Sequence, residues 1–476
     1  MTVISLDERP ESAKYTTAGV GPMGGWVRAG FEDIARVFRR QLRRTTGGAA
    51  VAVYHRGELV ADLWGGWRAE GQPWQRNTLA MCFSTTKGVI STALHLLADR
   101  GQIEYDAPVA AYWPQFAQHG KERITVRHVL THSAGLHRMR TLVDHAQRML
   151  DWEYMVSALE RAEPAYEPGT RHGYHALTYG WLAGELVRRV SRRPVAQFVE
   201  EELARPLALD GLYVGCPPEQ RGRVARLAPM AGALGGWLGL QVGAVMGGPV
   251  GQIPSLLRLP VSPRRLVDAL LPRGIEDVMW GPEVMDAEIP AANGFFTARS
   301  LAKLYALLAR GGEADGVRLL SPQTLEKIAV VHSRGPDHVL IVPMGWRLGY
   351  HSAFSTRGTV PGAFGHFGFG GSGGWADPRR DLALAMVCNS GTGTPIADLR
   401  MAELSTAVAR APGVHPLGND HHGTVRQAAL SNQVSHDPFG INDLDRTELG
   451  ACGRDRCGAQ ECWALTDTTS PVMWSA

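Results

Sequence analysis

The chain has 476 residues, of which 44 % are hydrophobic and 20 % are charged, and its formal net charge is +3. This composition is typical of a soluble globular protein with a substantial core, arranged as one large or two interleaved domains. The net charge is too small to favour a nucleic-acid partner, and no basic cluster with interleaved aromatic residues supports one.

The N-terminus and the cysteines indicate the compartment. Residues 1–14 are charged and contain no apolar run before a small-residue cleavage site, so no secretory signal is predicted. Scattered cysteines suit reduced thiols, here Cys82, Cys216 and Cys388. We therefore predict a cytoplasmic protein. The tail cysteines match no common zinc spacing, so we expect no metal.

The first hundred residues predict a helix, a hairpin and a second helix. The spacing over Phe31–Arg40 indicates a short amphipathic helix. Ala49–Tyr54 and Glu58–Trp64, joined by a turn at His55–Gly57, are typical of a β-hairpin. An apolar run then leads through residue 84 into a helix-like stretch, Gly88–Leu97.

The rest of the chain is helical in the middle and contains strands near its end. Helical signals run from Gln102 to Leu209, and a closing helix is expected over Ile396–Arg410. Strand-like runs return late, at Val339–Val342, Phe364–Phe369 and Leu382–Val387. The pattern predicts an α/β plus all-α fold, with an α/β sheet domain over 15–100 and 295–411 and a mainly helical domain, 101–294, inserted between. We expect the site in the cleft between these two parts.

Two segments fit this plan less easily. Residues 227–257 carry no charge and are rich in glycine, which favours a flexible lid or a wall of an acyl pocket. The alternative is an interfacial or membrane-associated segment, although Pro229, Pro249 and Pro254 disfavour a membrane-spanning helix. The tail, 412–476, is polar and without periodicity, and we predict that it is poorly ordered.

Ser84 and Lys87 form the motif that points most directly to chemistry. Residues three apart share one face of a helix, and a serine hydroxyl needs a neighbouring base to become a good nucleophile. A lysine serves as that base only if burial lowers its pKa, and the apolar flanks suggest such burial. The bland alternative is a capping serine beside a solvated lysine. Ser300 and Lys303 repeat the spacing and fit that alternative, with the serine near the N-cap of a helix and the lysine solvated in its first turn.

Two later segments could complete a site. Tyr174 follows a loop, and a tyrosine beside a buried cation can act as a base. The glycines around His366 and Gly368 would let a ligand approach backbone amides, which can then bind an oxyanion. Ser372 satisfies the G-x-S-x-G pattern, but a strand follows it where that motif requires a helix, so a glycine-rich turn is favoured.

Taken in order, these motifs resemble the serine β-lactamase-like family and, within it, the family VIII carboxylesterases, which are related to class C lactamases and D-alanyl peptidases. The segments Ile124–Leu136 and Pro290–Gly294 resemble further parts of that family. The resemblance implies an antiparallel sheet flanked by helices. It also implies a set of site residues, with Ser84 as nucleophile, Lys87 and Tyr174 as proton-transfer groups, His366-Phe367-Gly368 as the third motif, and the amides of Ser84 and Phe369 as the oxyanion hole. Whether lysine or tyrosinate takes the serine proton stays open.

Two departures from the family pattern favour an esterase over a lactamase. Class C lactamases have asparagine two residues after the tyrosine, where this chain has Ala176, and lactamases have lysine where it has His366. We predict a serine esterase that cleaves a small-molecule ester through an acyl-enzyme, without a cofactor. The alternatives are an acyltransferase, a β-lactamase or D-amino-acid peptidase and, from another class, an inactive membrane-associated or binding protein.

Overall fold

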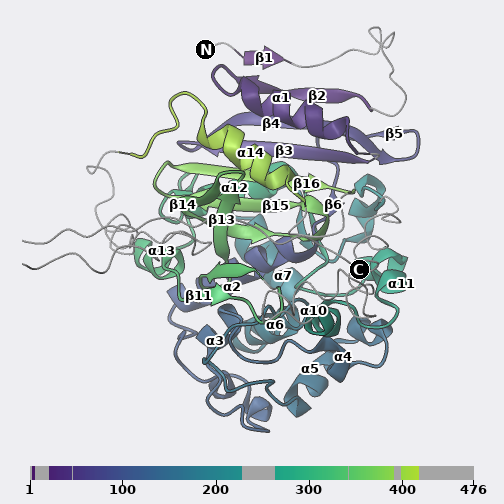
Figure 1. The fold of residues 1–476 in the computed structure, drawn as a ribbon, viewed down its shortest axis with the longest axis vertical. Helices are drawn as coiled ribbons and strands as arrows, with labels where there is room; N and C mark the ends of the chain where they lie inside the picture. The colour runs from purple at the N-terminus through teal and green to yellow at the C-terminus, as the bar shows by residue number, and fades with distance from the viewer. Residues whose placement is uncertain are drawn as a thin grey trace, which may run out of the picture. The chain divides into compact units, whose positions relative to one another are not determined.

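A large antiparallel sheet organises the structure, which is a computed structural model describing residues 3–5, 21–45, 47–227, 263–340, 342–390 and 398–417. Its eleven strands are β1 (Val3–Ser5), β2 (Met23–Arg28), β3 (Gly48–His55), β4 (Glu58–Ala69), β5 (Gln72–Pro73), β11 (Ser333–Pro336), β12 (Pro343–Trp346), β13 (His351–Ser355), β14 (Gly358–Phe367), β15 (Gly373–Asp377) and β16 (Leu382–Cys388). The order is β1-β2-β4-β3-β16-β15-β14-β13-β12-β11, with β5 paired to β4 (Figure 1).

The pairing of β3 with β16 joins the two ends of the chain, as the sequence predicted. Val53 lies opposite Leu384, and Val51 lies opposite Met386. Side chains alternate between the two faces of a strand, so these four residues enter one core while the alanines between them enter the other. The hairpin of β3 and β4 confirms the two strands expected there.

Helices cover both faces of this sheet. On one face, α1 (Glu32–Leu42) and α14 (Arg400–Ala409) pack together, and the apolar spacing of Ile34, Phe38 and Leu42 directs one side of α1 to the sheet. On the other face, α12 (Ala298–Ala309) and α2 (Thr86–Asp99) share the larger core. Both predicted N-terminal helices are confirmed, within the usual uncertainty at their ends.

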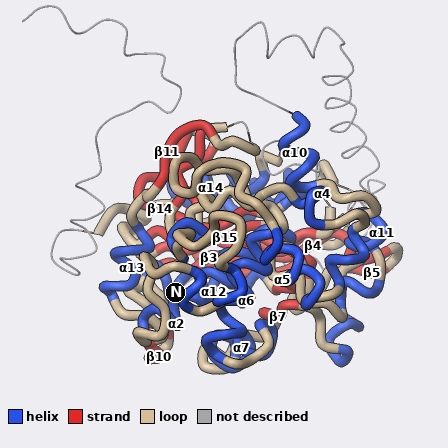
Figure 2. Tube along the Cα trace, turned by 90° about the horizontal axis from the view of Figure 1, so that it is seen from below, coloured by secondary structure: helices blue, strands red, loops and turns tan. Residues whose placement is uncertain are grey.

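The mainly helical region lies below the sheet in Figure 1, and in the view from below its helices lie in front of the strands (Figure 2). The remaining helices are α3 (Val126–Leu130), α4 (Met139–Leu142), α5 (Trp152–Arg161), α6 (Thr178–Ser191), α7 (Val195–Val199), α10 (Pro263–Leu270), α11 (Ile275–Trp280) and α13 (Pro322–Ala329). The small strands are β6 (Ala80–Met81), β7 (Leu212–Val214) and β8 (Gly294–Phe296), which form a three-stranded sheet, and the hairpin strands β9 (Glu313–Ala314) and β10 (Val317–Arg318). Packing of α2 against α6 connects the two regions, while the domain boundaries stay a prediction.

The structure corrects the late part of the sequence prediction. Val339 and Leu340 form a turn, and no strand covers them, because their amides donate to the carboxylate of Asp337. The strand predicted to end at Phe369 ends at Phe367. A 3₁₀ turn begins at Phe369 instead. The closing helix begins at Arg400; residues 391–397 lie outside the described part of the chain.

The two unusual segments fall largely outside the described residues, which include only Leu227 of the glycine-rich segment and residues up to 417 of the tail. No helix among the described residues has the length and apolarity that a membrane crossing requires. Cys82, Cys216 and Cys388 are free and buried, in agreement with the expectation of reduced thiols.

Candidate active site

Ser84 lies in a 3₁₀ turn, Phe83–Thr85, between β6 and the start of α2. The turn is held in an uncommon conformation, since Phe83 has a φ of 45°. The hydroxyl of Thr86 stabilises it by donating to the Phe83 carbonyl at 2.6 Å and accepting from the Gly294 amide at 2.8 Å. These hydrogen bonds fix Ser84 at the N-terminal end of α2.

Lys87 is fully buried and lies next to the serine. Its Nζ is 3.0 Å from the Ser84 Oγ and 3.0 Å from the carbonyl oxygen of Ala291, in the predicted segment Pro290–Gly294. No carboxylate pairs with it among the described residues. Burial lowers the pKa of Lys87 well below its usual value, because an ammonium without a counter-ion is costly in an apolar interior. The structure thus brings the two motif residues together as the spacing predicted.

Tyr174 lies in the loop before α6, with its ring beside the lysine. The Lys87 Nζ is 5.0 Å from the centre of this ring, which stacks on Trp346 with 5.6 Å between the ring centres. Burial raises the pKa of Tyr174, while an interaction with Ser84 acts to lower it. The phenol therefore holds its proton at neutral pH.

His366 and Gly368 approach the serine from β14 and the loop that follows it. Gly368 packs so closely that a Cβ there would collide with the carbonyl of Cys82 and the side chain of Thr85. The His366 Nδ1 donates to the Phe367 carbonyl at 3.1 Å, so in the neutral ring the Nε2 carries a lone pair. That buried Nε2 has no hydrogen-bond partner in the described part of the chain.

Phe369 lies in the next turn, and its ring meets that of Phe83 with 5.3 Å between the centres. The backbone amides of Ser84 and Phe369 donate no hydrogen bond within the described residues. Two unused amides on adjacent turns are the kind of donor that an oxyanion hole needs.

Three buried residues around Tyr174 were not singled out from the sequence, namely Asp337, Trp346 and His132. His132 was part of the segment Ile124–Leu136 but carried no signal of its own, and its ring lies edge-on to Tyr174 with 5.0 Å between the centres. Asp337 follows glycine and proline, a turn composition that could have marked it as a side-chain acceptor.

The two other serine motifs are engaged in local structure. Ser372 is 1 % exposed, its hydroxyl accepts from the amide of Cys388 at 3.1 Å, and strand β15 follows it directly. Ser300 bonds to Thr297, the residue that caps α12. The structure therefore agrees with the prediction that neither environment resembles that of Ser84.

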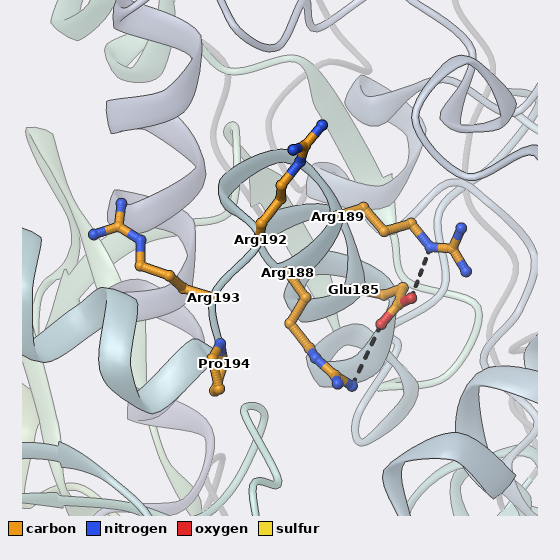
Figure 3. Close-up of a pocket in the computed structure, with 6 residues that line it drawn as sticks. All are labelled: Glu185, Arg188, Arg189, Arg192, Arg193 and Pro194. Carbon is orange, nitrogen blue, oxygen red and sulfur yellow. Dashed lines mark hydrogen bonds and ion pairs between the residues drawn. The ribbon is translucent and has the colours of Figure 1, made fainter.

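A separate cavity of about 290 Å³ lies at the C-terminal end of α6, lined by Glu185, Arg188, Arg189, Arg192, Arg193 and Pro194. Figure 3 shows Arg188 and Arg189 both directed at Glu185, with 2.7 Å between Arg189 Nε and the carboxylate. Arg193 pairs with Glu201 and Glu202. These charges stabilise the end of a helix, where cations are favourable, and none of the candidate catalytic residues lines the cavity.

Known proteins with similar sequences and structures belong to the family that the fold indicates. Residues 34–407 match the Beta-lactamase family. The chain is 41 % identical over 399 residues to the Esterase/beta-lactamase LipL of Mycobacterium tuberculosis, covering 81 % of this chain and 86 % of that protein. The crystal structure of a family VIII carboxylesterase superimposes with a TM-score of 0.69 at 30 % identity, covering 82 % of this chain and 99 % of the other. A penicillin-binding protein homologue from Caulobacter crescentus gives a TM-score of 0.68 at 32 % identity, over 81 % and 99 % of the two chains.

These matches define the class as hydrolases of the β-lactamase/transpeptidase-like fold. The chain belongs to the beta-lactamase family, as its motifs predicted, and its relatives support a serine hydrolase. Within the described ranges, no group of three histidine, cysteine or acidic side chains could hold a metal ion.

Proposed function

We propose that this protein is a serine esterase that cleaves carboxylic esters through an acyl-enzyme on Ser84. The observation that carries the proposal is the 3.0 Å contact between Ser84 Oγ and the Nζ of Lys87, a lysine that is fully buried and unpaired with any described carboxylate. An uncharged amine at that distance can remove the hydroxyl proton, which turns a weak nucleophile into a strong one.

We infer that Lys87, and not a tyrosinate, is the base. Burial lowers the pKa of Lys87 and raises that of Tyr174, so burial favours a neutral amine beside a neutral phenol. The amine can donate to the Ala291 carbonyl while its lone pair accepts the proton of Ser84. The serine oxygen then bonds to the ester carbonyl carbon.

Collapse of the tetrahedral intermediate breaks the bond to the alcohol oxygen, which needs a proton to leave. Tyr174 can supply it and recover one from Lys87, so that no proton is lost or gained overall. Water then attacks the acyl-enzyme by the same route, which returns Ser84 and releases the acid. The amides of Ser84 and Phe369 would bind the oxyanion in both halves, and the open Nε2 of His366 would bind a polar group of the substrate or the water.

The surroundings of Ser84 favour an uncharged ester with an apolar group. The ring of Phe83, the residue before the serine, contacts the rings of Phe369 and Trp280, and Trp280 is 36 % exposed. Exposed aromatic surface of this kind binds apolar groups. His366 is uncharged, since burial lowers its pKa, so it would not attract the carboxylate of a β-lactam as a lysine would.

Two substrates and one labelling experiment test the proposal. A fluorophosphonate should add to Ser84 alone, as found by peptide mass spectrometry, and p-nitrophenyl esters should be hydrolysed. The Ser372→Ala variant is the matched control and should keep both the adduct and the turnover. A chromogenic cephalosporin tests the second function, which the name of the relative LipL motivates. Turnover of the cephalosporin without ester turnover, or an adduct at Ser372, would contradict the proposal.

A further inference from the structure

One buried carboxylate organises the surroundings of Tyr174. Asp337 is 4 % exposed and lies just after β11, in the turn that leads to β12. Its Oδ1 accepts from the amides of Val339 and Leu340, both at 2.8 Å, and from the amide of Tyr174 at 3.1 Å. Its Oδ2 accepts from the indole Nε1 of Trp346 at 3.0 Å.

The chemistry of these partners favours the ionised form of Asp337. All four are N–H donors, so the carboxyl group acts toward each of them as an acceptor. Burial raises the pKa of Asp337, while the three backbone amides act to lower it. Neither lysine nor arginine pairs with it among the described residues, so the N–H dipoles, together with the nearby His172, favour its negative charge.

Each oxygen of the carboxylate helps to position the tyrosine. Through Oδ1 the carboxylate holds the backbone of Tyr174. Through Oδ2 it orients Trp346, whose ring lies parallel to the tyrosine ring within 6°. His132 fills the remaining side, edge-on to Trp346 with 4.3 Å between the ring centres. A single group thus sets the position of the phenol at both its main chain and its ring.

We propose that Asp337 is a positioning residue that holds Tyr174 in place for proton transfer. This inference rests on the proposed function, because it assigns Asp337 a role in the same proton path. It also explains the wrong strand prediction at Val339–Val342, since the amides that a strand would use are committed to the carboxylate.

The groups that face Tyr174 define what removal of the charge would do. They are Ser84 and Lys87 from the turn and helix α2, His132 from the loop after α3, Tyr179 from α6, Asp337 from the β11–β12 turn, Trp346 from β12, and His366 from β14. Burial raises the pKa of Tyr174, and the nearby charge of Asp337 raises it further. Burial lowers the pKa of Lys87, His132 and His366 and so favours their neutral forms. Without the carboxylate the phenol should ionise at lower pH.

Asp337→Asn tests this inference against Asp377→Asn, a fully buried carboxylate that pairs with Arg380 at the end of β15. We expect Asp337→Asn to lower kcat for a p-nitrophenyl ester about 10- to 100-fold with KM changed less than about twofold, because a small displacement of a reacting group has effects of this size. The alkaline limb of the pH profile should move to lower pH. Asp377→Asn should lower the thermal midpoint without either change. Equal kcat losses in the two variants would overturn the proposal.

A double-mutant cycle separates positioning from a general structural effect. In a Tyr174→Phe background, Asp337→Asn should have little further effect on kcat, since a residue that acts through the phenol has nothing left to act on. A loss as large as in the native background would overturn the inference. If Asp337→Asn does not fold, Trp346→Phe decides, because it keeps a ring and removes the bond to Oδ2; it should lower kcat, and an unchanged kcat would refute the role.

The proposed function can fail separately from this inference. Fluorophosphonate labelling of the native protein and of Asp337→Asn reports on Ser84 directly. No adduct on Ser84 in the native protein would overturn the esterase mechanism and this inference with it. An adduct in the native protein, together with unchanged kinetics in Asp337→Asn, would overturn the inference alone.

Discussion

The starts of helices α2 and α12 present the same motif in two environments. Ser84 lies in the 3₁₀ turn just before α2 and Lys87 in the first turn of that helix, while Ser300 and Lys303 lie in the first two turns of α12. In the first pair the side chains face each other at 3.0 Å, and the lysine is completely buried. In the second pair Lys303 turns instead to Asp315, with 2.6 Å between Nζ and the carboxylate, and its side chain is 18 % exposed.

The difference shows that spacing places two residues on one face of a helix but does not make a catalytic pair. What distinguishes Lys87 is burial without a counter-charge, which favours the neutral amine. Lys303 forms an ion pair with Asp315, and an ammonium in an ion pair has no lone pair with which to accept a proton. The two motifs therefore differ in the charge state of their lysines.

The largest contrast is expected between the two serines. Ser84→Ala should lower kcat for ester hydrolysis about 10⁴-fold or more, because the covalent intermediate cannot form. Ser300→Ala should leave kcat unchanged and cost about 1 kcal/mol of stability through loss of its bond to Thr297. Steady-state kinetics and thermal unfolding measure both, and comparable activity losses would remove the distinction between the two motifs.

The two lysines should differ nearly as much. Lys87→Ala should lower kcat about 10³-fold or more, since the members of a nucleophilic unit act together. Lys303→Ala, the matched control, should keep full activity because it loses only one partly exposed ion pair. Residual activity within tenfold of native for Lys87→Ala would transfer the role of base to another group.

The sequence predicted the sheet and the Ser84–Lys87 pair because both depend on local patterns. Short continuous apolar runs marked β3 and β16, and a three-residue spacing marked the motif. Tyr174 was a candidate base from its place after a loop, but only the family resemblance distinguished it from the other tyrosines. The structure places it beside Lys87 as that resemblance implied.

Contacts between distant segments account for what the sequence could not show. Asp337 and Tyr174 are separated by 163 residues, and their hydrogen bond has no trace in the local pattern of either segment. The apolar run Val339–Val342 resembled a strand because composition does not reveal that a side chain two residues earlier accepts its amides. The Ala291 carbonyl that receives Lys87 is likewise a backbone atom 204 residues away.

The smallest expected effect is a change in the pH dependence of stability. It tests the charge state of Lys87 most directly. Methionine matches the length of lysine without its charge, so Lys87→Met and Lys303→Met form a pair. Because burial lowers the pKa of Lys87 below its unfolded value, the unfolded chain binds one more proton between those two pKa values. Native stability should therefore fall as pH falls through that range, by about 1.4 kcal/mol per pH unit.

Lys87→Met lacks this dependence, so its free energy of unfolding relative to native should rise as the pH is lowered from about 10 toward neutrality. Chemical denaturation at several pH values measures the difference. Lys303→Met should lose about 0–1 kcal/mol, the same at each pH, because its ion pair is partly exposed. Parallel curves for Lys87→Met and the native protein would mean that Lys87 keeps its proton when folded. The base would then have to be Tyr174, and the contrast between the two helices would be one of geometry instead of charge.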